Sequence, residues 1–334
     1  MHDSSSPRLE MSDVLRMIEN IFWSFAVVGV CYVMKCLRRA RLLHYNLKMI
    51  LTNLSIAMIG YGCCRLAKNM ESIAHYYGIG PRNMAYRTSM LVAKIYFVTS
   101  MLIGLFCVLM LTVERTVATF VPERYEQMKK TGKGFVVFAL FWAVSVGISI
   151  MLNLFWQKTN PQTNDNTVLF SSFLVSVNIE FLLGVIYAAI PASVANGVLV
   201  CFLYNHNKKR RIQLDRSKLN VRYQYAENIV TTRLLLALTG ADFVGSVVAA
   251  TLISCYYVAR RNELMSDNDL LFIEQSFHVM MSMYAIWYNV IFLAMHRPNR
   301  DQLIRDVKSI EGHRLSFKNE GAVYFSYLSR QWNA

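Results

Sequence analysis

Apolar residues in this chain gather in seven long blocks, each separated from the next by a polar segment. Each block holds about 20 residues or more, enough for a helix to cross a hydrocarbon core of ~30 Å. Helices are expected because lipid offers no partner to an unpaired backbone group. The pattern therefore predicts an all-α membrane protein with a seven-transmembrane helix bundle. The blocks are Ile18–Leu37, Leu47–Leu66, Leu91–Val113, Phe135–Trp156, Asn178–Tyr204, Leu234–Val258 and Leu270–Met295.

Lys and Arg are distributed unevenly between the segments that connect the blocks. Alternate segments carry 24 of these basic residues, namely 38–48, 114–134, 205–233 and 296–334. The other set carries 8, in segments 1–17, 67–90, 157–177 and 259–269. Because basic loops stay on the cytoplasmic side, the first set is expected inside. Seven crossings then predict an extracellular N-terminal tail at 1–17, a membrane domain at 18–295 and a cytoplasmic tail at 296–334.

The overall composition agrees with a membrane protein. Of 334 residues, 54% are hydrophobic and 17% are charged, and the formal net charge is +14. Soluble domains are about 45–50% apolar and about 25% charged. The basic residues occur in short runs between apolar blocks and form no continuous face. We therefore expect them to contact anionic membrane lipids, and we expect no nucleic-acid partner.

Sequence motifs of catalysis and metal binding are absent. There is no zinc-binding His-Glu-x-x-His, no Gly-x-Ser-x-Gly and no phosphate-binding loop. The seven cysteines lie within or at the edges of apolar blocks, and none has a metal-type spacing with His partners. We therefore predict that the protein is no enzyme and has neither a cofactor nor a metal site.

The third block ends at Glu114 and Arg115, on the side expected to be cytoplasmic. An acid followed by Arg at this helix end resembles the Asp/Glu-Arg-Tyr signature of rhodopsin-like G-protein-coupled receptors. Pro122, Trp142 and Pro191 also match positions where that family has Pro or Trp. The resemblance implies that Arg115 is held at rest and meets a G protein on activation. The alternative is a charge pair that marks a helix end at the membrane surface.

Other positions depart from the rhodopsin-like pattern. The second block has no acid, and the outer segment 157–177 has no cysteine. The seventh block has Asn289-Val290-Ile291-Phe292 in place of Asn-Pro-x-x-Tyr, and it has no lysine for a retinal Schiff base. The protein is therefore neither an opsin nor a close relative of the amine receptors.

Three stretches resemble nematode serpentine chemoreceptors of the Sra superfamily, most closely class Sre, with class Srab as the alternative. They are His44-Tyr45-Asn46-Leu47-Lys48, Glu114-Arg115-Thr116-Val117-Ala118-Thr119-Phe120 with Tyr125-Glu126 after it, and Leu219-Asn220-Val221-Arg222-Tyr223-Gln224-Tyr225-Ala226-Glu227-Asn228-Ile229. The likeness implies a G-protein-coupled chemosensory receptor in the plasma membrane of sensory neurons. Its partners would be a heterotrimeric G protein, a small-molecule ligand from outside and membrane lipids. A ligand-gated channel or transporter is the alternative, which the predicted orientation and the lack of internal repeats disfavour.

Two acids of the sixth predicted helix are candidates for a conformational switch, one on its cytoplasmic extension and one within the apolar block. Glu227, at the cytoplasmic start of the helix, is predicted to help hold Arg115 at rest; alternatively it is a solvated acid near a helix N-terminus. Asp242 lies near mid-membrane, where ionisable side chains are costly and usually functional. It is either a switch paired with Asn153 or Asn289, or a protonated acid satisfied by one interhelical hydrogen bond.

Polar residues near the outer ends of the blocks are predicted to form a ligand pocket with apolar walls. Glu274 and His278 are four residues apart and so share one helix face. Each residue taken alone is more often an interface anchor or a packing group. The set is Lys94, Tyr96, Thr99, Glu180, Tyr257, Glu274 and His278.

The segment after the seventh block predicts a short amphipathic helix on the inner leaflet. Leu303, Ile304 and Val307 are spaced as one apolar face, with basic residues around it.

Overall fold

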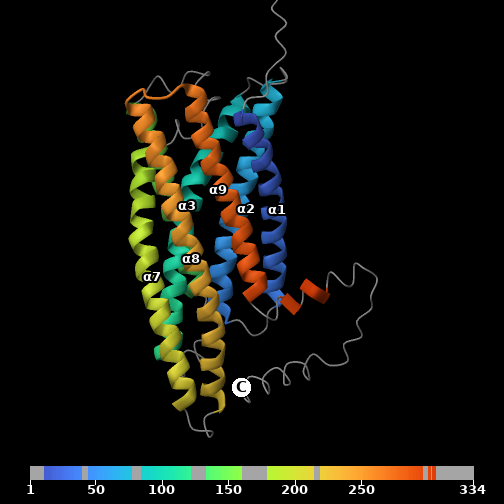
Figure 1. Cartoon of the computed structure of the whole chain (residues 1–334), viewed down its shortest axis with the longest axis vertical. Coiled ribbons are helices and arrows are strands. Elements are labelled where there is room, and N and C mark those ends of the chain that lie inside the picture. The colour runs from blue at the N-terminus through green and yellow to red at the C-terminus, as the bar shows by residue number, and fades with distance from the viewer. Residues whose placement is uncertain are drawn as a thin grey trace, which may run out of the picture.

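The computed structural model describes residues 11–39, 44–76, 84–121, 133–159, 179–213, 219–295, 300–301 and 303–305. This part of the chain forms seven long helices and contains no strand (Figure 1). All seven are long and apolar enough to cross a membrane, which confirms the predicted seven-helix, all-α fold. The helices are α1 (Met11–Arg39), α2 (Tyr45–Tyr76), α3 (Met84–Phe120), α5 (Lys133–Thr159), α7 (Ile179–Gln213), α8 (Leu219–Arg261) and α9 (Asp267–Met295).

Helices α7 and α8 are longer than their apolar blocks require. They hold 35 and 43 residues, and Figure 1 shows both running on beyond the other helices at the end opposite the start of α1. We call that end the inner end, following the predicted orientation. Because α8 begins at Leu219, Glu227 lies on a helical extension ahead of the apolar block, as the sequence predicted. Asn178, the predicted start of the fifth block, lies outside the described residues.

The bundle packs around α3, which contacts α2, α5, α7 and α8, while α1 packs against α2 and α9. Its interior consists of two apolar clusters. The inner cluster includes Leu37, Leu111 and Phe292, and the outer cluster includes Phe97 and Phe277. This division leaves a region at mid-bundle where polar side chains and a cavity lie.

Two glycines allow neighbouring helices to approach closely. A Cβ atom at Gly60 would collide with the ring of Tyr96, whose hydroxyl donates to the backbone carbonyl of Ile56 on α2 at 3.1 Å. A Cβ at Gly29 would likewise meet Asn289. Small residues at such contacts are usual in membrane helices because they permit close backbone packing.

The turn between α8 and α9 has a regular helix-capping pattern. Glu263 adopts a positive φ of 51°, its amide donates to the carbonyl of Arg260, and the amide of Leu264 donates to the carbonyl of Ala259. This pair of hydrogen bonds is the Schellman motif that closes a helix C-terminus. Ser266 then caps α9, because its hydroxyl accepts a hydrogen bond from the amide of Asp269 at 3.3 Å. The outer ends of α8 and α9 are therefore held side by side.

The predicted helix after the seventh span is described only in part. Residues 300, 301 and 303–305 are helical, and Ile304 is exposed. Val307, which would continue the apolar face, lies outside the described residues, as does most of the predicted cytoplasmic tail.

Candidate functional site

Arg115 lies buried at the inner end of α3, with only 2% of its surface exposed. Its guanidinium pairs with both carboxylate oxygens of Glu114, from Nε to Oε2 at 2.5 Å and from Nη2 to Oε1 at 2.6 Å. A buried charge is costly unless it is paired and fully hydrogen-bonded. This two-point pairing accounts for the stability of a charged side chain at this depth.

The remaining donors of Arg115 reach across to α8. Nη1 donates to the hydroxyl of Thr231 at 2.7 Å and to the side-chain carbonyl of Asn228 at 3.3 Å. The amide nitrogen of Asn228 in turn donates to the backbone carbonyl of Ala118 on α3 at 3.0 Å. We call Glu114, Arg115, Asn228 and Thr231 the arginine clasp. It ties the inner ends of α3 and α8 together.

Two further contacts extend the arginine clasp to α2 and α7. Nδ1 of His44, at the start of α2, lies 4.0 Å from Oε1 of Glu114. Asn207 on α7 donates from its side-chain amide to the hydroxyl of Thr119 at 3.1 Å. The three sequence stretches that carry the family resemblance therefore meet at one place, through His44, Glu114 with Arg115, and Asn228.

Glu227 lies beside the arginine clasp, and its role in holding Arg115 stays a prediction. Its backbone carbonyl accepts a hydrogen bond from the hydroxyl of Thr231 at 2.9 Å, and its carboxyl lies close enough to Arg115 and Glu114 to interact with their charges. The two hydrogen bonds from Arg115 to α8 given above go to the neutral acceptors Asn228 and Thr231. The adjacent Asn228, present in the sequence pattern, was the signal that sequence reasoning passed over. Pro122, Tyr125 and Glu126 lie outside the described residues.

Asp242 lies on α8 at mid-bundle, and its partners come from α7 and α9. The hydroxyl of Ser193 donates to Oδ2 at 2.6 Å, and the hydroxyl of Tyr284 also hydrogen-bonds the carboxyl. The partners named from sequence are engaged elsewhere. Asn153 donates to the carbonyl of Ser149 on its own helix, and Asn289 donates to the carbonyl of Ala26 on α1.

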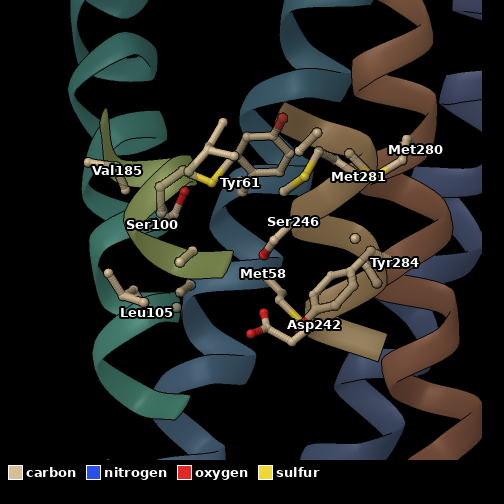
Figure 2. A pocket seen from close by; sticks show the side chains of 18 of the residues that line it. Met58, Tyr61, Ser100, Leu105, Val185, Asp242, Ser246, Met280, Met281 and Tyr284 are labelled. Carbon is tan, nitrogen blue, oxygen red and sulfur yellow. The ribbon is translucent and has the colours of Figure 1, made fainter. Parts of the chain in front are cut away.

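A cavity of about 140 Å³ opens beside Asp242, between α2, α3, α7, α8 and α9, with Trp23 of α1 also in its lining. Figure 2 shows Asp242 and Ser246 on one side of it and Ser100 and Leu105 on another. Its walls are mostly apolar, with four methionines among them. The methionines are Met58, Met101, Met280 and Met281.

The seven residues of the predicted ligand pocket do not form one cluster, and none of them lines this cavity. On α3, the hydroxyl of Thr99 contacts that of Ser149 on α5 at 3.0 Å, Tyr96 packs near Trp142 of α5, and Lys94 is half-buried.

Two pairs from that predicted set do come together. Between the outer ends of α7 and α8, Tyr257 donates its hydroxyl proton to Glu180 at 3.1 Å. Oε1 of Glu274 lies 3.7 Å from Nε2 of His278 on α9. Their role in ligand binding stays a prediction.

Sequence reasoning missed a buried polar network at the outer end of α1, α2 and α9. Glu19 accepts two hydrogen bonds from Arg65, at 2.7 and 2.9 Å, and a third from Asn69 at 2.9 Å. Nearby, the hydroxyl of Tyr61 lies 3.0 Å from Nδ1 of His278. We call these residues, together with Glu274, the outer polar network. Its signal was an acid in the first block and an arginine near the end of the second.

The described residues hold no group of three or more His, Cys, Asp or Glu side chains that could bind a metal ion. What they do hold is a buried arginine between two helix ends and a small cavity with one acid. This combination suits recognition of a small molecule and a change in helix position.

Comparison with known families gives one match, which covers almost the whole chain. The model of a family described as serpentine type 7TM GPCR receptor class ab chemoreceptor matches residues 3–333. The match confirms the serpentine chemoreceptor prediction and selects class ab, the alternative, over class Sre. No curated protein matches the chain.

Proposed function

The chain belongs to the class ab family of serpentine seven-transmembrane chemoreceptors, and we propose that it binds a small external ligand and activates a heterotrimeric G protein. The proposal includes a place in the plasma membrane, with the N-terminus outside, and expression in sensory neurons.

The observation that carries the proposal is the convergence of His44, Glu114, Arg115 and Asn228 at the inner ends of three helices. A receptor needs a resting and an active arrangement of its helices, and we infer that the arginine clasp is closed in the first and open in the second. In the described arrangement Arg115 holds α8 against α3. If the inner end of α8 moved away, the guanidinium would lose both of its α8 acceptors and would become available to a cytoplasmic partner. A ligand favours that second arrangement only by the difference in its affinity for the two.

Ligand-dependent nucleotide exchange tests this function directly. The intact receptor is reconstituted in lipid with a heterotrimeric G protein, and a chemical panel is screened for compounds that accelerate exchange. We expect Arg115→Ala to abolish the accelerated exchange while ligand binding is retained. A ligand-gated ionic current that needs no G protein would overturn the proposal and favour the channel alternative.

A further inference from the structure

The mid-bundle cavity has the form of a ligand site, but its polar groups differ from those expected at the outer end of the bundle. Most of its lining is contributed by aliphatic, aromatic and methionine side chains. Among its polar members, Asp242 and Ser246 are one helical turn apart on α8 and so share a face. Figure 2 shows the side chains of both at the cavity. The cavity is thus mostly apolar, and Asp242 and Ser246 form a polar corner of it.

Asp242 retains capacity to accept further hydrogen bonds in that corner. An ionised carboxylate offers about four acceptor positions, and the described residues supply donors from Ser193 and Tyr284. Among the described residues no Lys, Arg or His lies within ion-pair distance of the carboxyl. Acids inside a membrane are retained where they have a partner or a function. A partner that donates hydrogen bonds is therefore the chemical complement of this site.

We propose that the cavity binds a small, mainly apolar molecule with one hydrogen-bond-donating head group, an alcohol or an amine, which donates to Asp242. The apolar body of the ligand lies against Gly104 and the methionines. The inference rests on the proposed function, because it takes this cavity as the receptor's ligand site. It places recognition at mid-bundle, next to the residues that join α8 to α7 and α9.

The size of the cavity limits the ligand to about one ring or a short chain. An apolar cavity of roughly 150 Å³ admits benzene, and this cavity measures about 140 Å³. Gly104 adds to the available space, since a Cβ atom built there would meet no heavy atom within 4 Å. Methionine walls are adaptable, so a substituent the size of a hydroxymethyl or aminomethyl group can be accommodated.

The position of Asp242 also explains how such a ligand could act on the helices. Its carboxyl joins α8 to Ser193 on α7 and to Tyr284 on α9. Gly245 lets the Tyr284 ring approach α8, because a Cβ there would lie 3.3 Å from Cδ2 of that ring. A donor from the ligand adds a further hydrogen bond to the same carboxyl. Binding therefore changes the contacts of α8, whose inner end the arginine clasp holds against α3.

A matched set of four probes tests the head group. Benzyl alcohol, benzylamine, toluene and benzoate share one ring and differ in charge and in the ability to donate a hydrogen bond. Binding is measured as the increase in melting temperature of the purified, full-length receptor in lipid nanodiscs. We expect benzyl alcohol, benzylamine or both to stabilise the receptor, and toluene and benzoate to give no comparable increase. Equal stabilisation by toluene, or none by either donor, would refute the proposal.

Two glycine variants locate the binding site. Gly104→Leu places a side chain in the cavity, and we expect it to remove the increase given by the donor probes. Gly147→Leu is the matched control, because Gly147 is exposed on α5 and a Cβ there also meets no atom within 4 Å. An increase that persists in Gly104→Leu would mean that the probes bind in the lipid or elsewhere on the receptor.

Substitutions of Asp242 distinguish binding of an alcohol from binding of an ammonium group. Asp242→Leu removes the acceptor, and we expect donor binding to weaken about tenfold or more. Asp242→Asn keeps an oxygen acceptor but removes the negative charge, so an alcohol should retain its binding whereas an ammonium group should lose it. Unchanged binding of both probes in Asp242→Leu would overturn the assignment of Asp242.

Nucleotide exchange measured on the same samples distinguishes this inference from the proposed function. Probes that bind the cavity without changing exchange would leave the inference standing and count against the signalling role. Exchange that responds to a ligand in the Gly104→Leu receptor as strongly as in the unmodified one would support the signalling role and refute this site.

Discussion

At the scale of single residues, the buried arginine illustrates how a charged side chain can be hydrogen-bonded to a partner helix through neutral groups. Arg115 pairs with the acid next to it in sequence and reaches α8 through a hydroxyl and an amide. A hydrogen bond from a guanidinium to a neutral acceptor is weaker than one to a second carboxylate would be. Such bonds are worth about 1.5–3 kcal/mol each, which suits a contact that breaks in the activation we propose.

This arrangement predicts that Thr231→Val raises basal nucleotide exchange. The substitution keeps the branched shape but removes an acceptor from the arginine clasp, and loss of that bond should shift the resting equilibrium by about tenfold toward the open arrangement. Basal exchange without ligand is the measurement. Asn228→Ala should act in the same direction.

Glu227→Gln is the matched comparison for Thr231→Val, because the carboxyl of Glu227 interacts with Arg115 through charge alone in the described contacts. We expect it to raise basal exchange less than Thr231→Val. A larger effect of Glu227→Gln would show that charge, and not the hydroxyl contact, holds the resting state. No effect at all would remove Glu227 from the switch.

The sequence revealed Arg115 because an acid–Arg pair follows the end of the third apolar block, and Asp242 because it is an acid within the sixth block, near mid-membrane. Asn228 and Thr231 did not stand out, since neutral polar residues are common at helix ends and their partners depend on how two helices are rotated. The rotation of each helix, which the sequence does not determine, also explains why the residues predicted to form one pocket lie apart. Thr99 and Glu180 were predicted to line one pocket, but their helices turn them toward α5 and α8 respectively.

At the scale of helices, the sequence predicted each membrane span but not which spans are neighbours. Block length and hydrophobicity determine which segments span the membrane. Which helices become neighbours depends instead on the shapes of their surfaces and on a few polar contacts. The pairing of α1 with α2 shows this. Glu19 is fully buried, and its two-point contact with Arg65 fixes both the depth and the rotation of one helix against the other.

This buried pair predicts a difference between single and double substitution. Arg65→Met leaves the charge of Glu19 without its partner, so the free energy of unfolding should fall by about 3–5 kcal/mol. Glu19→Leu combined with Arg65→Met removes both charges and should recover most of that loss. Thermal unfolding of the purified variants provides the comparison. If the double variant were no more stable than the single one, uncompensated charge would not be the cause.

At the scale of the whole molecule, the proposed functions assign the arginine clasp and the mid-bundle cavity to different parts of the bundle. The cavity lies between the two apolar clusters, and the arginine clasp lies at the inner end where α7 and α8 extend farthest (Figure 1). Helix α8 takes part in both, through Asp242 and through Asn228 and Thr231. Rigid movement of this one helix is therefore enough to couple the two sites.

The proposed role of the arginine clasp requires that it faces the cytoplasm. The uneven distribution of Lys and Arg predicts this orientation. An epitope tag placed before residue 1 should be accessible to antibody on intact cells, and a tag after residue 334 should be accessible only after permeabilisation. The physical reason is that 24 basic residues lie in the segments assigned to the inner side and 8 in the others, and translocation of basic loops is disfavoured. Each tag serves as the control for the other. A protected tag at residue 1, or an accessible one at residue 334, would place Arg115 outside the cell, where no G protein could reach it.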